Sequence, residues 1–475
     1  MRKRILDIVQ EALRPPLKIL FAIEGRRLGL AKYPQIRVTP PGPKALEVLD
    51  RDRKVLSPYN RPFCYPFVAH TARDCIVRDV DGNEYIDFNS GLVAMNVGHC
   101  HPKVVEAIRR QAGEFMHYSY TDFYYPHVVE LAEKFLPKTP GKFEKKVYFG
   151  NSGAESIEAA IKVTKWHTGK HRFLAFIGAF HGRTIGALSL TSSKPVQMAR
   201  FFPTMPGVTH VPYPYCYRCA FKMTYPGCDY YCVDFIDEMI LHRYVPPEEV
   251  AAFFFEPVQG EGGYVVPPPE YFQRLKKLAD KYGILLVADE VQTGMARSGK
   301  WFAIEHWNVE PDVLCTSKAM AAGLSIGATV SKAEIMDWEA GAHCTTLAAN
   351  PVACAAAMAV IDVIEEERLW ENAAKQGDYI QKRFRELQGG SEMIGDVRGK
   401  GLMIGVEFVK NRQTKQPAGR EVDEVLQKCF KKGVLAISGG DSTIRIAPPL
   451  TITRELLDAG LEILSEAIAE VEAGR

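Results

Sequence analysis

Four groups of residues in this sequence of 475 amino acids carry polar or small side chains directly after short apolar runs. In chain order they are residues 150–155 (GNSGAE), residues 180–183 (FHGR), Asp289 and Lys318. Small residues at the start of a helix expose backbone N–H groups to an anion, and the helix dipole adds to the attraction. An aromatic side chain can stack on a planar ring, a buried carboxylate requires a cationic partner, and a desolvated lysine can attack an aldehyde.

Each group alone also fits a structural role: a capped turn, a packed core phenylalanine, a loop cap, and a lysine whose amine reaches solvent. Their combination is more specific. Pyridoxal phosphate needs an anion cradle, a contact for its ring face, an anion that keeps its ring nitrogen protonated, and an amine for its aldehyde. The sequence therefore predicts an enzyme that uses pyridoxal 5'-phosphate to withdraw electrons from the α-carbon of its substrate.

The elements that must position these groups are predicted by the alternation of apolar runs and helical patterns between residues 85 and 331. Short runs rich in branched and aromatic residues are typical of strands that are buried on both faces. They occupy residues 146–149, 173–177, 251–255, 284–288 and 313–316. This pattern predicts an α/β fold with a mostly parallel sheet flanked by helices, and such sheets bind ligands at the carboxyl ends of their strands.

The pattern changes after about residue 350, where a long helix over residues 353–368 precedes β-like runs at 402–408 and 444–447. We expect a smaller α+β domain there. The predicted organisation is a basic extension (1–35), a segment packing with the small domain (36–95), a large cofactor-binding domain (96–350) and a small domain (351–475). The extension has eight basic and three acidic residues, and its helical spacing of apolar residues predicts a short amphipathic helix that packs on the body or a partner subunit; binding to a membrane surface or another partner is the alternative.

Several motifs also resemble a known family. NSGAES, FHGRT, EPVQGEGG, DEVQTG, SKA and RIAPPLT are similar to motifs of the class III (ω-amino acid) aminotransferases, which are fold-type I pyridoxal phosphate enzymes. The resemblance covers residues 65 to 465. It implies that Lys318 forms the Schiff base and carries the proton, that Asp289 pairs with the ring nitrogen, and that Gln292 bonds the ring hydroxyl. It places Phe180 on one face of the ring and Val291 on the other.

The resemblance also assigns the phosphate site. Ser152, Gly153 and Ala154 would cradle the phosphate, and Thr346 would reach it from a neighbouring subunit. Each active site would then be completed by a second copy of the chain, so the expected assembly is a homodimer or a dimer of dimers.

Substrate contacts follow the pattern of the 4-aminobutyrate and ornithine members of that family. It places Arg445 near the substrate α-carboxylate, with Glu261 as its resting partner, and arginine binds carboxylates in a bidentate manner. An open pair would accept an α-amino acid and a closed pair an ω-amine; the alternative is a purely structural ion pair. Arg183 is a second candidate for carboxylate binding, and Glu256 is expected to position groups beside the ring.

The activity expected from this resemblance is transamination from an amino acid or ω-amine to a 2-oxo acid, 2-oxoglutarate above all, with ping-pong kinetics. An amino-acid racemase on the same scaffold is the alternative, because the groups around the cofactor would be unchanged. A nucleic-acid-binding protein is disfavoured, since the formal net charge is only +2.

The sequence departs from the family pattern at three places. Met295-Ala296 replaces an aromatic-glycine pair, Ser325 replaces a proline, and Ala348-Ala349 replaces a glycine pair. No chemical group is lost, so these changes bear on substrate choice more than on activity.

An insertion between the FHGRT and EPVQGEGG motifs, residues 212–232, carries Cys216, Cys219, Cys228 and Cys232. Their C-x2-C-x8-C-x3-C spacing is compatible with structural zinc, with two disulfides or with reduced packing cysteines, and the catalytic interpretation needs no metal. Eleven scattered cysteines and no apolar run long enough to cross a bilayer favour a cytoplasmic protein without a membrane segment.

Overall fold

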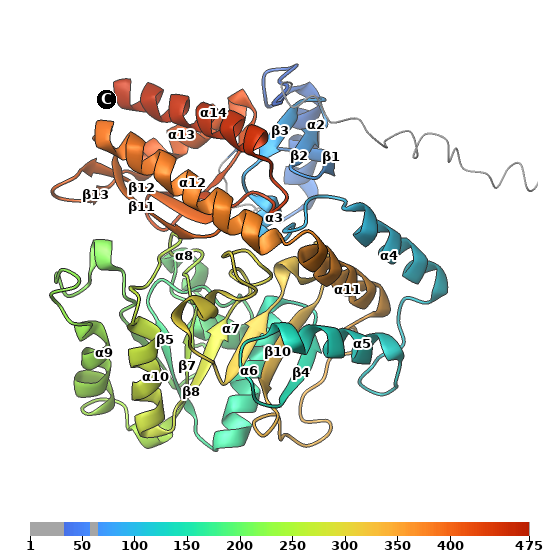
Figure 1. Cartoon of the computed structure of the whole chain (residues 1–475), viewed down its shortest axis with the longest axis vertical. Helices are drawn as coiled ribbons and strands as arrows, with labels where there is room; N and C mark the ends of the chain where they lie inside the picture. The colour runs from blue at the N-terminus through green and yellow to red at the C-terminus, as the bar shows by residue number, and fades with distance from the viewer. Residues whose placement is uncertain (1–32, 58–64, 475) are drawn as a thin grey trace, which may run out of the picture. The chain divides into compact units, whose positions relative to one another are not determined.

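A seven-stranded sheet lies at the centre of the region that carries the predicted cofactor site (Figure 1). The structure is a computed structural model and describes residues 33–57 and 65–474. The strand order is β4-β10-β9-β8-β7-β5-β6, and β10 is the one strand of this sheet that runs opposite to the other six. The strands are β4 (Lys145–Gly150), β5 (Arg172–Phe176), β6 (Val208–Val211), β7 (Val250–Phe255), β8 (Leu285–Asp289), β9 (Val313–Thr316) and β10 (Gly327–Lys332).

Helices cover both faces of this sheet because its strands are apolar on both sides. Helix α6 (Gly153–Thr168) contributes Ile157 and Ile161 to a buried cluster with Phe173 and Phe254. On the opposite face, Phe255 contacts a phenylalanine of α10 (Tyr271–Tyr282) with ring centroids 4.7 Å apart. All six residues of β7 are buried. The mostly parallel α/β architecture predicted from the sequence is therefore confirmed, and the bounds of the five predicted strands of this sheet differ by at most one residue.

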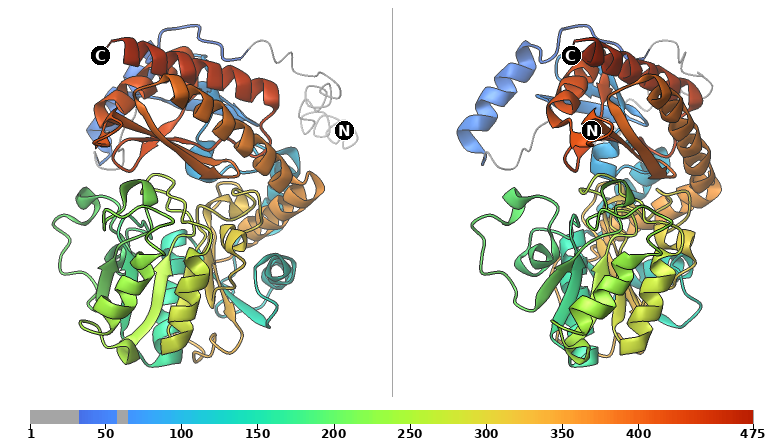
Figure 2. Two further views of the ribbon diagram at one scale, coloured as in Figure 1. Left: turned by 60° about the vertical axis from the view of Figure 1, so that its left-hand side comes forward. Right: turned by 90° about the vertical axis from the view of Figure 1, so that its left-hand side faces the viewer.

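The C-terminal part of the chain forms a separate antiparallel sheet, called here the C-terminal sheet, with the order β11-β12-β16-β15 and with β13 beside β12 (Figure 2). Its strands are β11 (Ile394–Lys400), β12 (Met403–Asn411), β13 (Gln416–Pro417), β15 (Ile437–Gly439) and β16 (Thr443–Ile446). The helices of this part are α12 (Leu369–Gly390), α13 (Gly419–Lys432) and α14 (Arg454–Ala473).

Residues near the beginning of the described chain pair with this C-terminal part. Strands β1 (Ala69–Arg73), β2 (Ile76–Asp79) and β3 (Glu84–Asp87) form a sheet with β14 (Val434–Leu435), which runs parallel to β3. The remaining helices described are α2 (Pro43–Val55), α3 (Ser90–Val93), α4 (Pro102–Glu114), α5 (Pro126–Phe135), α7 (Ile185–Leu190), α8 (Pro195–Met198), α9 (Tyr231–Phe235) and α11 (Pro351–Glu366).

Helix α11 is the long helix predicted over residues 353–368. It ends two residues early because Arg368 adopts a left-handed φ of 49° at the turn into α12. Residues Pro34–Arg475 form one compact unit, so the boundaries at 95/96 and 350/351 stay predictions. The amphipathic helix expected near the N-terminus lies outside the described residues. Within those residues, the structure contains no helix with the length and apolar character needed to cross a membrane.

Candidate active site

A cavity of about 410 Å³ lies at the carboxyl ends of the parallel strands. Ten of the thirteen residues predicted for the site line it: Ser152, Gly153, Ala154, Phe180, Arg183, Glu256, Asp289, Val291, Gln292 and Lys318. They follow five different elements of the chain, β4, β5, β7, β8 and β9. Their convergence is the geometry expected when parallel strands end at one edge of a sheet.

The N-terminus of α6 forms one end of this cavity. Ser152 has an extended backbone and caps the helix, and its Oγ accepts a hydrogen bond from the Glu155 N–H at 3.2 Å. Gly153 allows a close approach, because a Cβ there would stand 2.7 Å from the Val291 side chain. The helix start therefore presents backbone N–H groups and a positive dipole end, with little side-chain bulk, to an anion in the cavity.

Asp289, the last residue of β8, is buried and bonded to a histidine. Its Oδ2 lies 2.7 Å from His181 Nδ1, and its Oδ1 accepts the N–H of Val291 at 3.0 Å. His181 is held in turn by its N–H, which donates to Thr191 Oγ1 at 2.9 Å. These bonds fix the carboxylate in one orientation at the end of the strand.

Lys318 stands two residues after β9 with a left-handed φ of 37°. Burial lowers the pKa of its amine, and the negative charges of Asp289, Glu261 and Glu256 oppose part of that effect. Ser317 Oγ donates to the Ile326 carbonyl at 2.6 Å and fixes the turn. A lowered pKa favours the neutral amine, which is the nucleophilic form.

Glu256 is buried one residue after β7. Its Oε1 accepts the N–H of Phe180 at 2.8 Å, and its Oε2 accepts the N–H of Gly260 at 2.9 Å. Burial and the nearby charge of Asp289 raise the pKa of Glu256 to about 7. The two hydrogen bonds that Glu256 accepts hold the backbone of Phe180 and of Gly260 in place.

Arg445 and Glu261 form an ion pair beside this cavity rather than in its wall. Arg445 is buried on β16, and its Nη1 lies 2.7 Å from Glu261 Oε1. Arg445 Nε donates to the Ser438 carbonyl at 3.0 Å, and Lys194 Nζ lies 3.9 Å from Glu261 Oε2. Burial alone would raise the pKa of Glu261, but the positive charges of Arg445 and Lys194 outweigh burial and lower it.

The family model "Aminotransferase class-III" matches residues 59–468. This chain belongs to the class III aminotransferase family. It is 41% identical to an alanine/serine racemase of Pyrococcus horikoshii over 94% of this chain and 95% of the relative, and 41% identical to a leucine/methionine racemase of Thermococcus litoralis (90% and 96%). It is 39% identical to a probable 4-aminobutyrate aminotransferase of Bacillus subtilis (82% and 90%). A solved (S)-enantioselective omega-transaminase of Thermomicrobium roseum superposes with a TM-score of 0.83 at 32% identity, over 90% of this chain and 99% of that one.

As a class III aminotransferase, the chain depends on pyridoxal phosphate, and two buried atoms fit that cofactor. Gln292 Oε1 and His181 Nε2 are buried and have no hydrogen-bond partner among the described residues. An acceptor without a donor suits the hydroxyl of the cofactor ring, because a buried polar atom that stays unpaired is costly. Asp289, Lys318 and the start of α6 supply the carboxylate, the amine and the anion site that the same molecule requires.

Thr346 does not line the cavity of its own subunit. It is exposed, and its neighbour Leu347 is 61% exposed. Its contact with phosphate across a subunit interface stays a prediction.

Two of the three departures from the family pattern occur where the backbone has left-handed φ values. Ala296 has φ 70° and Ala349 has φ 47°, and this conformation favours glycine. Both alanines therefore hold a backbone conformation that side chains rarely adopt. Ser325 is the departure that lines the cavity itself.

No role was predicted for His181 from the sequence, although this residue lies in the quoted FHGR motif. The signal available was a histidine one residue after the predicted ring-stacking phenylalanine. Gly323, Leu324, Ile326 and Ala94 also line the cavity and carried no recognisable signal, and Asn151 lies in the quoted GNSGAE group without an assigned role.

The four cysteines of the insertion line a second, small cavity of about 30 Å³. All four are free thiols, and no cluster of three or more potential metal ligands occurs in residues 33–57 and 65–474. Burial, together with the other cysteines, raises the pKa of Cys216 to about 11 and that of Cys232 to about 12, which favours protonated thiols. Metal analysis and a thiol count would distinguish reduced thiols from zinc and from disulfides.

Proposed function

We propose that this chain is an aminotransferase that moves an amino group from an amino acid or an ω-amine, of 4-aminobutyrate or ornithine type, to a 2-oxo acid such as 2-oxoglutarate. The observation that carries this proposal is the ion pair between the buried Arg445 and the partly exposed Glu261, 2.7 Å apart, beside the Lys318 cavity. A ping-pong aminotransferase must accept two different substrates in one site. An arginine that a mobile carboxylate can cover or release gives one site two binding modes.

The residues around the cavity have distinct tasks in this proposal. Bound pyridoxal phosphate supplies an electron sink for the substrate α-carbon. Lys318 Nζ, whose lowered pKa favours the neutral amine, removes the proton from that carbon. Asp289, oriented by His181, provides the negative charge that holds a protonated ring nitrogen, and Phe180 and Val291 confine the ring.

The Arg445–Glu261 pair would select between substrates. With the pair closed, the charge of Arg445 is neutralised, and the space beside it suits the neutral end of an ω-amine. With Glu261 turned away, Arg445 can bind the α-carboxylate of an amino acid or a 2-oxo acid through two hydrogen bonds. Arg183 lies over the Phe180 ring at 5.4 Å and is the second carboxylate-binding candidate in the cavity wall.

The proposal includes a homodimer, or a dimer of dimers, in which Thr346 of one subunit completes the phosphate site of the other. Its support is the exposure of Thr346 and Leu347 and the absence of Thr346 from the lining of its own subunit's cavity. A cytoplasmic location is proposed on the free thiols of the described cysteines, which suit a reducing compartment.

Racemisation is the second candidate, because two relatives at 41% identity carry racemase names. One experiment tests both: the holoenzyme is incubated with L-amino acids and ω-amines, with and without 2-oxoglutarate, and the products are analysed on a chiral column. Transamination predicts L-glutamate formed only when the acceptor is present. Inversion of an amino acid without acceptor, and no glutamate with it, would replace the proposal by racemisation.

A further inference from the structure

The C-terminal sheet brings a row of charged side chains to the face that carries Arg445. Across β11, β12 and β16, Arg398 is paired with Gly405 and Gly405 with Arg445. In the adjacent row Glu407 lies between Asp396 and Thr443. Directly opposed residues of antiparallel strands point to the same face, as do residues two apart on one strand. Arg398, Glu407 and Arg445 therefore share one face of the sheet.

The loop that carries Glu261 lies directly on this face. A Cβ at Gly405 would stand 3.0 Å from the Gly263 carbonyl oxygen and 3.2 Å from the Tyr264 side chain. Arg398 Nη2 donates to the Gly263 carbonyl at 2.7 Å, and its Nε donates to the Tyr264 carbonyl at 3.2 Å. Arg398 thus fixes the backbone two and three residues after Glu261.

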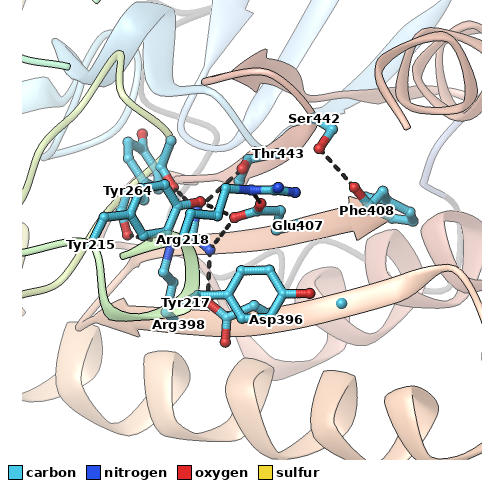
Figure 3. A network of polar contacts seen from close by, with 12 residues as sticks. Tyr215, Tyr217, Arg218, Tyr264, Asp396, Arg398, Glu407, Phe408, Ser442 and Thr443 are labelled. Carbon is cyan, nitrogen blue, oxygen red and sulfur yellow. Dashed lines mark hydrogen bonds and ion pairs between the residues drawn. The ribbon is translucent and has the colours of Figure 1, made fainter. Parts of the chain in front are cut away.

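Glu407 is the buried centre of the surrounding network (Figure 3). Its Oε2 accepts from Arg398 Nη1 at 2.6 Å and from the Tyr215 hydroxyl, and its Oε1 accepts from Arg218 Nε. A buried carboxylate is stable only when cations and donors surround it, so its loss disturbs every partner. Glu407 therefore links the loop anchor, Arg398, to two residues of the Cys-rich insertion.

The insertion also contacts the beginning of the same loop. The Tyr213 hydroxyl donates to the Glu256 carbonyl at 2.9 Å and lies 3.2 Å from the Pro257 carbonyl. The insertion is bound to the C-terminal part by Lys415, whose Nζ donates to the Tyr217 carbonyl at 2.9 Å. The segment from Glu256 to Tyr264 is thus held at its start by Tyr213 of the insertion. Near its end it is held by Arg398, which the insertion contacts through Glu407.

We infer that Glu407 is a positioning residue for the Glu261–Arg445 pair, and that through it the Cys-rich insertion sets which substrates the site accepts. This inference rests on the aminotransferase proposal for its effect on turnover. The loop backbone is fixed by Arg398 and by the Gly440 N–H, which donates to the Glu261 carbonyl at 2.7 Å. The Glu261 side chain can therefore leave Arg445 while its backbone stays in place. Weakening the Glu407 network loosens that backbone and reduces the fraction of molecules in which the pair is closed.

The test is the affinity of the holoenzyme for glutarate, a dicarboxylate that cannot react, measured by the absorbance of the bound cofactor. A carboxylate ligand binds Arg445 only when Glu261 has left, so its apparent affinity scales with the open fraction. Glu407→Gln should bind glutarate about 3- to 10-fold more tightly. The ratio of kcat/KM for the 2-oxo acid to kcat/KM for an ω-amine should rise by a similar factor, through KM.

Two further variants keep the test decisive. Arg218→Gln changes a side chain that is 22% exposed, so this variant should fold even if Glu407→Gln does not. It should raise the glutarate affinity and the kcat/KM ratio as Glu407→Gln does, by a smaller factor. Asp229→Asn is the matched control, because it removes an ion pair between the insertion and Arg274 of α10, on a contact that does not involve Glu407.

The inference is overturned if Glu407→Gln and Arg218→Gln both leave glutarate affinity within 2-fold of wild type. An equal change in Asp229→Asn overturns it as well, because that result shows a general loosening of the insertion. If glutarate affinity responds as expected while the wild-type protein transfers no amino group, the positioning role stands and the aminotransferase proposal fails.

Discussion

Glu256 and Glu261 follow the same strand, β7, and lie five residues apart, yet they belong to two regions with opposite electrostatics. Glu256 faces the cofactor cavity, where burial and the charge of Asp289 raise its pKa to about 7. Glu261 faces Arg445 and Lys194, whose charges lower its pKa despite burial. The first carboxyl group holds backbone N–H groups in a negative environment, and the second neutralises Arg445, the cation proposed to bind the substrate carboxylate.

The two regions also differ in how the chain builds them. In the cofactor region the side chains lie at or soon after the ends of five strands of the large sheet, so their positions depend on strand register and short turns. In the substrate region Arg445 and Glu261 are 184 residues apart in sequence, the first on the C-terminal sheet and the second in the loop after β7. The difference indicates that the cofactor site is rigid by construction, whereas the substrate site depends on how the loop after β7 lies on the C-terminal sheet.

The largest effect on the cofactor region is expected from Lys318→Ala. This variant removes the amine that is proposed to hold the cofactor and to move the proton, and proton transfer alone contributes about 10²- to 10⁴-fold to rate. We expect kcat to fall at least about 10⁴-fold and the absorbance of the lysine-bound cofactor to disappear. Lys382→Ala, at an exposed position of α12, is the matched control and should retain both. A Lys318→Ala protein with normal turnover would refute the assignment of this lysine.

A smaller effect tests whether the cofactor region is rigid. A Cβ at Gly153 would stand 2.7 Å and 3.0 Å from the two methyl groups of Val291. Overpacking of this kind costs about 1–3 kcal/mol, so Gly153→Ala should weaken cofactor binding about 10-fold, measured by titration of cofactor-free protein. In a Val291→Ala background the same change should have little effect, because the opposing methyl groups are gone. An equal loss of cofactor affinity in both backgrounds would show that the steric conflict is not with Val291.

The cofactor region was largely predictable from the sequence because its signals are local. Short apolar runs that end in Asp289 and Lys318 indicated both the strands and the edge at which their side chains meet. The bond between His181 and Asp289 joins residues 108 apart, and no sequence pattern specifies which carboxylate a histidine will meet. For the same reason Glu407 and Arg398 gave no signal, since their roles appear only when an insertion and a loop pack on one sheet face.

Arg297 is a further example, in the fold, of contacts between distant residues that the sequence does not predict. It is fully buried and donates to Asn96 Oδ1 at 2.6 Å and to the carbonyls of Pro448 at 2.6 Å and Leu402 at 3.0 Å. Three distant segments of the chain therefore meet at one guanidinium. The sequence places this arginine two residues after DEVQTGM without any indication that its donors bind carbonyl and amide oxygens.

The smallest expected effect is on the pH dependence of thermal stability, which Glu256 and Glu261 should influence differently in cofactor-free protein. The pKa of Glu256 is about 7 in the folded state and about 4.5 in the unfolded state, so the folded protein binds more protons between these values. The stability that this carboxyl contributes is therefore complete below pH 4.5 and is lost as pH rises to about 7. The difference in Tm between wild type and Glu256→Gln should decrease by a few degrees from pH 5 to pH 8, since each pKa unit is worth about 1.4 kcal/mol.

Glu261 should give the opposite dependence, because its folded pKa lies below its unfolded value. Its contribution is present above pH 4.5 and is lost only as pH falls through the lowered pKa. The Tm difference between wild type and Glu261→Gln should therefore stay constant from pH 5 to pH 8 and decrease in more acidic buffer. Parallel slopes for the two variants in the neutral range would mean that both carboxyl groups share one electrostatic environment, and the division between a cofactor region and a substrate region would be wrong.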